Sequence, residues 1–300
     1  MAKTPRIQQM TFADFDRMFP DEESCKDYLM QHRWPNEVQC PRCKNTEVYS
    51  LESRPYHWQC QNCAPKGYRF SLLVGTIFEN TNYPLRTWFR IIHMMLTSKK
   101  GISALQIHRL VGIGSYRTAW YLCHRVRAGL QDGAFRKLMG IVVVDETFVG
   151  GKAKNRHNSD RDGRTGGTGS GKSVVVGAVQ RKGNVVARVI ANVKAEALTG
   201  FVKEAVADNV SLLVTDQWMG YRQLHKQYPY KVINHARGEY VVGAAHTNTI
   251  EGFWSIFKRG VVGTFHKVSK KYMPLYVAEF EFRYNNRLNK DIFGAAIAGC

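Results

Sequence analysis

Two pairs of cysteines constrain the fold of this chain more than any other feature of its sequence. Cys40 and Cys43 form one CxxC pair, Cys60 and Cys63 form another, and 16 residues separate the two pairs. This spacing lets two tight turns present four thiolates tetrahedrally to one zinc ion, as in a zinc ribbon. The alternatives are unrelated cysteines or two redox pairs, which the paired spacing disfavours. Four thiolates leave no open coordination position, so the sequence predicts a structural Zn²⁺.

Helical patterns lie on both sides of this segment. Residues 11–35 alternate aromatic and polar positions at helical spacing. Pro84 opens a second helical stretch, residues 83–130, which a glycine-bearing turn at 111–115 interrupts. The pair of helices around this turn predicts a helix-turn-helix with Tyr116–Arg127 as the recognition helix. A helical packing module without DNA contacts is the alternative interpretation.

The pattern changes from helical to strand-like at residue 141. Short β-branched runs predict strands at 141–150, 172–180 and 184–193, and Arg181, Lys182 and Gly183 join the last two as a hairpin. The elements expected next are a helix at 198–209, a strand at 211–216, a short helix at 220–227, a strand at 230–235 and a final helical region. This order is that of an RNase H-like α/β fold.

These patterns predict an α/β protein in three parts. An N-terminal region with the zinc ribbon covers residues 11–75, a helix-turn-helix-like DNA-binding module covers 80–132, and the RNase H-like domain covers 140–290.

Carboxylates follow two of the predicted strands. Asp145 ends the apolar run IVVVD and Asp216 ends SLLVTD, so both are expected at one edge of the sheet. Glu251 lies 35 positions beyond Asp216, at the start of an apolar helix. Three such carboxylates can hold two Mg²⁺ ions for an in-line displacement at phosphorus. Turn formation by the aspartates, and a capping box from Asn248 to Glu251, are the structural alternatives.

The chain is strongly basic. Lys and Arg outnumber Asp and Glu by 43 to 24, which gives a formal net charge of +19. Such an excess repels itself in the folded state unless a polyanion is the usual partner. Nucleic acid is favoured, because each neutralised phosphate releases a counterion. An anionic membrane surface is the other candidate, but the sequence lacks the basic amphipathic helix that this would require.

The sequence also indicates a compartment. Its first residues lack the apolar region of a signal peptide, and no apolar stretch is long enough for a membrane span. The seven cysteines are an odd number and do not form a disulfide framework in a chain of 300 residues. We therefore expect a reducing cytoplasm.

A glycine-rich segment matches the phosphate-loop pattern. Gly166–Ser173 fits GxxxxGK[ST] and alone would indicate an NTPase. That site needs a preceding strand and a following helix, whereas here a charged loop precedes and an apparent strand follows. A flexible basic loop along DNA, including Lys172, is the favoured interpretation.

Further basic residues are candidates for DNA contacts, although charge runs are usually solvated faces. The recognition helix offers Arg117, His124, Arg125 and Arg127. The C-terminal part offers Lys258, Arg259, His266, Lys267, Lys270, Lys271, Arg283 and Arg287. Of two tryptophans near the carboxylates, Trp254 is expected in the core, and Trp218 is left open between core and base stacking.

With these motifs in place, the chain resembles bacterial DDE-type insertion-sequence transposases of the ISXO group, which pair a zinc ribbon with an RNase H-like domain. The resemblance rests on the four cysteines, on VDETFVGGK at 144–152, on TDQWMGY at 215–221 and on the block at 246–287. It implies that Asp145 and Asp216 are the first two catalytic residues. The third position varies between Glu and Asn in this group, so Asn248 competes with Glu251.

The resemblance implies a Mg²⁺- or Mn²⁺-dependent transposase that cleaves the ends of its element and joins the freed 3′-hydroxyl to target DNA. Its expected partners are the terminal inverted repeats, the target DNA and further copies of itself, on the nucleoid. Two other readings stay open: a catalytically silent zinc-ribbon DNA-binding protein derived from a transposase, and a metal-dependent nuclease or resolvase.

Overall fold

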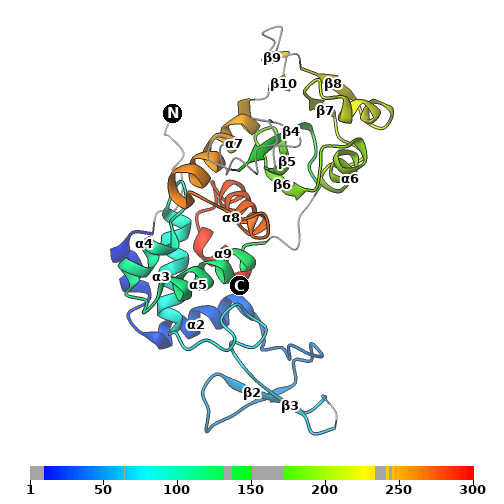
Figure 1. The fold of residues 1–300 in the computed structure, drawn as a ribbon. Helices are drawn as coiled ribbons and strands as arrows, with labels where there is room; N and C mark the ends of the chain where they lie inside the picture. The colour runs from blue at the N-terminus through cyan, green and yellow to red at the C-terminus, as the bar shows by residue number, and fades with distance from the viewer. Residues whose placement is uncertain are drawn as a thin grey trace, which may run out of the picture. The chain divides into compact units, whose positions relative to one another are not determined.

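The computed structural model describes residues 10–63, 65–131, 137–150, 172–233, 241–242, 245–246 and 248–300. The chain forms two compact units, whose elements are labelled in Figure 1. The first unit contains Met1–Ser98, Ile102–Gln131 and Arg287–Cys300, and the second contains Lys99–Gly101 and Asp132–Asn286.

Helices form the core of the first unit. They are α1 (Phe12–Met18), α2 (Glu22–Arg33), α3 (Leu85–Thr97), α4 (Ala104–Val111), α5 (Tyr116–Gly129) and α9 (Ile292–Ala298). Capping boxes at Thr11 and Asp21 start α1 and α2. The buried rings of Phe15, Phe19 and Phe89 pack around Phe293 of α9, with centroids 5.5–6.4 Å from it. The last helix therefore completes a core begun by the first ones.

The predicted ribbon is an antiparallel sheet in the same unit. Its strands are β1 (Val48–Ser50), β2 (His57–Cys60) and β3 (Tyr68–Ser71), in the order β1-β2-β3. Trp58 on β2 packs edge-on against Trp34, which directly follows α2. The strand β2 ends at Cys60 and so leads into the second cysteine pair.

A mixed sheet forms the centre of the second unit, in the order β6-β5-β4-β7-β8. These strands are β4 (Ile141–Val149), β5 (Ser173–Gln180), β6 (Val185–Ile190), β7 (Leu212–Thr215) and β8 (Tyr230–Val232). β4, β5 and β6 pair antiparallel, whereas β7 and β8 run parallel to β4. Two short strands, β9 (Val241–Val242) and β10 (Ala245–His246), pair separately.

Each face of this sheet carries its own core. One core contains residues of α6 (Ala195–Ala205) and the 3₁₀ segment η3 (Met219–Lys226). The other contains residues of α7 (Asn248–Gly260), the π-helical η5 (Val261–Phe265) and α8 (Met273–Asn285), as Figure 1 lets the reader follow. Alternate β4 residues enter the two cores, Val142 and Val144 on one side and Val143 on the other, because successive strand side chains point to opposite faces.

The structure confirms an α/β protein and most predicted elements, with two differences. The helix expected at 198–209 spans Ala195–Ala205, because the backbone is extended at Val206. There the Ala205 carbonyl accepts from the N–H of Leu138 and the N–H of Ala207 donates to the Leu138 carbonyl, which forms an isolated parallel bridge. β4 runs to Val149, close to the end predicted for this strand, so Asp145 lies inside the strand although it ends the apolar run. Among the described residues, no helix is both long and apolar enough to cross a bilayer.

Candidate active site and metal centre

The two aspartates lie side by side at the sheet. β4 and β7 are parallel, with Val142 paired to Leu213 and Val143 paired to Val214. The same register, continued by two residues, places Asp145 beside Asp216, on strands about 4.8 Å apart. The Asp216 Oδ1 accepts a 3.0 Å hydrogen bond from the backbone N–H of Trp218, which fixes the carboxylate at the turn after β7.

A tryptophan of α7 holds the Asp145 carboxylate. The Nε1–H of Trp254 donates a 3.0 Å hydrogen bond to Asp145 Oδ2. The indole can reach this position because Gly177 on β5 is paired with Asp145 and has no side chain. A Cβ at Gly177 would lie 2.7 Å from the Trp254 ring, closer than atoms can approach. Trp254 is 4% exposed, which confirms its predicted place in the core, but its hydrogen bond to Asp145 was not anticipated.

Both candidates for the third position lie in the first turn of α7. Glu251 is exposed, and its negative charge contributes to the raised pKa of Asp145. Asn248 is the first residue of the helix and is three positions away, so the two side chains share one helix face. The predicted capping box had Asn248 before the helix, whereas α7 begins at Asn248 itself; Thr247 lies outside the described residues.

The electrostatics of the site indicate converging negative charge. The pKa of Asp145 is raised to about 6, chiefly by burial and then by the charges of Asp216 and Glu251, while the hydrogen bond from Trp254 lowers it. A buried carboxyl whose ionisation neighbouring carboxylates oppose is a group that a divalent cation would neutralise, and carboxylate oxygens are donors that Mg²⁺ accepts. The chemistry of Asp145, Asp216 and Glu251 thus suits the predicted Mg²⁺, whereas among the described residues the group of metal-ligating side chains already close enough together to hold an ion is the cysteine quartet.

A fourth carboxylate, which the sequence interpretation missed, lies on the other face of β4. Glu146 Oε2 accepts a 2.7 Å hydrogen bond from the hydroxyl of Tyr221, a fully buried residue of η3. Burial raises the pKa of Glu146 to about 7, and the charges of Asp216 and Asp145 also raise it. The signal was present in the sequence as a second acid directly after Asp145, but the strand continuing past Asp145 was needed to interpret it.

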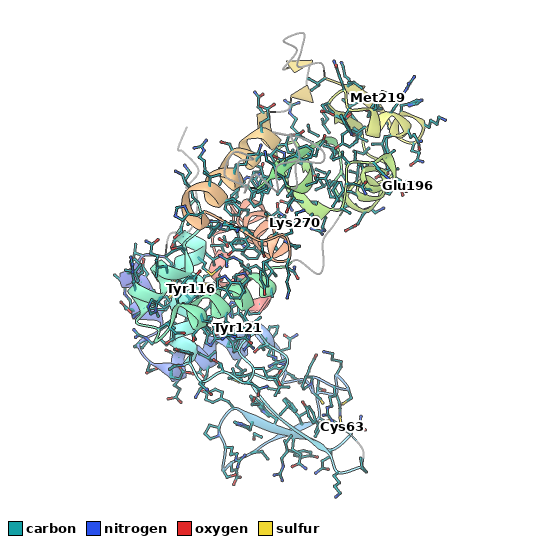
Figure 2. The ribbon with its side chains drawn as sticks, viewed as in Figure 1. Cys63, Tyr116, Tyr121, Glu196, Met219 and Lys270 are labelled. Carbon is teal, nitrogen blue, oxygen red and sulfur yellow. The ribbon has the colours of Figure 1, made fainter. Side chains whose placement is uncertain are left out.

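The four cysteines form the predicted metal centre. Their sulfur atoms all lie within 4.8 Å of one another, with Cys40 Sγ 3.7 Å from Cys63 Sγ and Cys43 Sγ 3.6 Å from Cys60 Sγ. Zinc–sulfur bonds of about 2.3 Å at tetrahedral angles require sulfur separations of about 3.8 Å. The arrangement thus fits one structural Zn²⁺, and Figure 2 labels Cys63 in the turn after β2.

On the helix-turn-helix candidate, the basic residues divide into exposed and buried ones. Arg117 is exposed, and so are the neighbouring Tyr116 and Tyr121, labelled in Figure 2. Arg125 donates to the carbonyl of Glu79 at 2.9 Å.

Two residues of that helix are removed from the DNA-contacting set by their burial. Arg127 is 2% exposed and His124 is 7% exposed, so neither side chain can reach a nucleic acid in this conformation. The prediction that these two residues contact DNA was wrong. It rested on their basic side chains, whereas the face of α5 on which they lie, with positions 123, 124, 126 and 127, is buried in the helical core.

The C-terminal basic residues also divide. Lys258, Arg259, His266, Lys267, Lys270 and Lys271 are exposed. Arg283 has only 10% of its side chain exposed, where it pairs with the buried Glu279 at 3.4 Å and packs on the ring of Phe280. We correct its assignment to a structural one. Arg287 is half-buried and belongs to the first unit.

The remaining predicted residues lie near the sheet. Lys172 directly precedes β5, a strand, so the helix that a phosphate loop needs does not follow it; residues 151–171 lie outside the described residues. Trp218 is 43% exposed, and its Nε1–H donates to the carbonyl of Val193 at 3.2 Å.

Comparisons with known proteins agree with these features. Residues 137–285 match the ISXO2-like transposase domain family, and residues 20–66 match the transposase zinc-ribbon domain family. A protein of the transposable element ISH50 from Halobacterium salinarum is 28% identical over 281 residues, covering 89% of this chain and 92% of that protein. A chain of the simian T-cell lymphotropic virus intasome in complex with PP2A regulatory subunit B56 gamma aligns over 65% of both chains, with 12% identity and a TM-score of 0.30. The predicted similarity to ISXO transposases is confirmed by the family matches.

Proposed function

The chain carries both domains of an ISXO-type transposase, a zinc ribbon and an ISXO2-like transposase domain, and from this premise we propose that it cuts the ends of an insertion sequence and joins them to target DNA. The observation that supports this chemistry most is that Asp145 lies on β4 and Asp216 directly follows the adjacent parallel strand β7, with the charges of Asp216 and Glu251 both acting on Asp145.

The proposal includes an RNase H-like fold for the second unit. The strand order β6-β5-β4-β7-β8 supports it, with an antiparallel trio followed by two strands parallel to β4. In the proposed functional division, residues 140–290 form the catalytic domain, 80–132 the DNA-binding module and 11–75 the zinc-ribbon region. The compact unit Asp132–Asn286 supports the first of these boundaries.

In the proposed mechanism, Asp145, Asp216 and Glu251 hold Mg²⁺ or Mn²⁺. When bound, such ions activate the attacking oxygen and stabilise the leaving oxygen of an in-line displacement. The Trp254 indole orients Asp145 by its hydrogen bond, and the backbone N–H of Trp218 orients Asp216. The attacking groups are water and then a DNA 3′-hydroxyl, so the reaction needs no protein nucleophile.

Glu251 is the third ligand in this proposal, because its charge already acts on Asp145. Asn248 lies on the same helix face and is the competitor. Glu251→Gln should abolish joining if Glu251 is the ligand, whereas Asn248→Ala should then retain it. The opposite pattern would assign the position to Asn248.

DNA contacts are proposed for cations whose side chains are not buried. The exposed ones are Arg117 on α5 and Lys258, Arg259, His266, Lys270 and Lys271 in the C-terminal part, and the partly buried ones are Arg125, Lys172 and Arg287. The partners are the terminal inverted repeats and target DNA, bridged by more than one copy of the chain. Because its substrate is genomic DNA, we place the protein on the nucleoid.

A strand-transfer assay tests the proposal. Purified protein is mixed with duplexes of the element's own ends and a target plasmid, with or without Mg²⁺. We expect joined products that require Mg²⁺ and that vanish in Asp145→Ala and Asp216→Ala but persist in the matched control Asp208→Ala, which changes an exposed acid after α6.

The same assay separates the alternatives. Binding to the ends without cutting or joining would support a silent DNA-binding protein. Cleavage of branched DNA without any joined product would support a nuclease or resolvase. Either outcome contradicts the transposase proposal.

A further inference from the structure

A basic pocket lies in the second unit at the end of α7. It has a volume of about 580 Å³ and is lined by Lys100, Lys258, Arg259, Val262, Gly263 and Thr264. Its charged lining residues are all cations, and in the described part of the chain none of them forms an ion pair with a carboxylate. A pocket with this lining attracts an anion, and the hydroxyl of Thr264 adds a neutral hydrogen-bond donor.

Two glycines allow the backbone at Lys100 to come close to the end of α7. A Cβ at Gly260, the last residue of α7, would lie 2.7 Å from the carbonyl oxygen of Lys100, so only glycine lets the two segments approach this closely. Gly101 has φ +83°, and a Cβ there would lie 2.5 Å from the ring of Phe265. The backbone on both sides of the contact is therefore shaped to bring a cation from residue 100 to the end of α7.

Simple stabilisation of a helix end does not account for these cations. Lys and Arg often occur in the last turn because they complement the partial negative charge of unpaired carbonyls there. Here α7 continues without a break into the π-helical η5, so Lys258 and Arg259 do not lie at a free helix end. Short π-helical segments occur frequently at functional sites.

The pocket is also aligned with the candidate active site. Glu251 and Lys258 are seven residues apart on α7. Seven residues are two helical turns, so both side chains lie on one face, about 10 Å apart along the axis. Successive phosphates of one DNA strand rise about 3.4 Å along the duplex axis and lie farther apart than this in space, so the separation spans at most roughly three nucleotides.

We propose that this pocket binds a backbone phosphate of the DNA strand being processed, within about three nucleotides of the reacting phosphate. The inference rests on the proposed function, which supplies the position of the reacting phosphate. Lys100 and Lys258 neutralise the bound phosphate, and Arg259 joins them from a guanidinium that hydrogen-bonds to Ser255. The contact fixes the register of the strand along α7 without reading its bases.

Direct DNA binding by the full-length protein tests the pocket. Mg²⁺ is left out so that no cutting occurs, and no chelator is added, so the zinc is retained. Affinity for a duplex of the element's end is measured against salt concentration for wild type and for Lys100→Gln, Lys258→Gln and Arg259→Gln. Loss of the one phosphate contact, in the variant that combines all three substitutions, should make the slope of log affinity against log salt shallower by about 0.9, and each single variant should give a part of this change. Lys203→Gln, which removes an exposed cation of α6, is the matched control and should retain the wild-type slope.

A second pair of variants changes Gly263, which lines the pocket. A Cβ at Gly263 would meet nothing within 4 Å, so side chains fit there. Gly263→Ala should bind DNA like wild type, whereas Gly263→Glu should weaken binding several-fold at low salt by repelling the phosphate. Equal affinities for the two would overturn the proposal.

Neutral methylphosphonate linkages then locate the phosphate. One such linkage within about three nucleotides of the cleavage position should weaken binding of wild type, and should weaken a variant with Lys100→Gln, Lys258→Gln and Arg259→Gln combined no further, because the linkage and the combined substitutions remove the same contacts. Unchanged salt slopes in all the lysine and arginine variants, with wild type still joining ends to target, would refute the pocket and leave the transposase function standing. Shallower slopes in a protein that neither cuts nor joins would support the pocket and refute the function.

Discussion

At the scale of single residues, the candidate site depends on the indole of Trp254, which is part of the hydrophobic core and also hydrogen-bonds to the carboxylate of Asp145. Trp254 packs between α7 and the sheet and donates to Asp145 Oδ2 at 3.0 Å. Gly177 provides the space for its ring. The same contact therefore joins the stability of the sheet face to the orientation of a carboxylate that we propose as a metal ligand.

Trp254→Phe should keep most of the packing and lose the hydrogen bond. Because misplacing a reacting group by about 1 Å can cost roughly 100-fold, we expect joining to fall by about ten- to 100-fold and the Mg²⁺ concentration for half-maximal activity to rise. Gly177→Ala should act in the same direction and also destabilise the fold by about 1–3 kcal/mol through overpacking. Normal Mg²⁺ dependence in both variants would show that the indole has no orienting role; urea denaturation reports their folding.

Glu146 gives a prediction for pH. Its folded pKa, about 7, is raised above the ordinary value by burial. Between the unfolded and folded pKa values the unfolded chain binds fewer protons, so the free energy of unfolding falls as pH rises from about 4.5 to about 7. Glu146→Gln should remove part of this fall, measured by urea denaturation without added Mg²⁺. Any zinc loss at low pH affects wild type and Glu146→Gln alike, so the difference between their free energies of unfolding reports on the Glu146 carboxyl. Identical dependence of both free energies on pH would contradict the prediction.

At the scale of elements, we expect the stability of the short zinc ribbon to depend on its metal, whereas the orientation of α5 decides which of its side chains are exposed. β1, β2 and β3 offer few buried side chains of their own, chiefly Trp58 and Phe70. On α5, one face is buried in the helical core and the other exposes Tyr116, Arg117 and Tyr121. Loss of the metal should therefore affect the folding of the ribbon, whereas changes on the exposed face of α5 should affect DNA binding.

Zinc removal should unfold the ribbon. We expect one zinc per chain by elemental analysis, and its loss in Cys40→Ser and Cys60→Ser, because ligand sets missing one thiolate bind far more weakly. Cys300→Ser, which changes a cysteine of the first unit outside the cluster, should keep the zinc. Full zinc content in Cys60→Ser would rule out the four-thiolate site.

The two arginines of α5 should give opposite phenotypes. Arg117→Ala should weaken binding to DNA and leave stability within about 0.5 kcal/mol, as is usual for an exposed position. Arg127→Ala should destabilise the protein by about 3 kcal/mol, the scale for disrupting a buried charged contact. Fluorescence anisotropy and urea denaturation measure the two effects. Equal DNA affinity of Arg117→Ala and wild type would favour the packing interpretation of this module.

At the scale of the whole molecule, charge sets the general affinity for nucleic acid while the two compact units carry different tasks in our proposal. A net charge of +19 is spread over both units and is not confined to one segment. Such a distribution favours sequence-independent binding to phosphates, on which specific recognition of element ends must be built.

Binding to an unrelated duplex should therefore depend steeply on salt. If six or more phosphates are contacted, affinity should fall about 1,000-fold or more between 50 and 200 mM salt. Titration of a labelled scrambled duplex measures this fall, with the element's own end as the comparison. A weak salt dependence would mean that the basic residues are mostly solvated surface.

The sequence alone determined the features that depend on local spacing. Each CxxC turn is local and brings two thiolates together, and the spacing of the two pairs is that of one zinc site. The β-branched apolar runs from residue 141 onward favour strands by their own composition. It also identified Asp145 and Asp216 as candidates, because both follow buried apolar runs.

Only the tertiary structure decided which side chains those elements bring together. Helix phase against a core decided that Arg127 is buried while Arg117 is exposed. Strand pairing decided that Gly177 opposes Asp145 and admits Trp254, and that Glu146 meets Tyr221 on the opposite face. The close packing of α9 with the N-terminal helices, and of Lys100 with the end of α7, joins residues far apart in the chain. Contacts of this kind depend on long-range packing, which no local spacing in the sequence encodes.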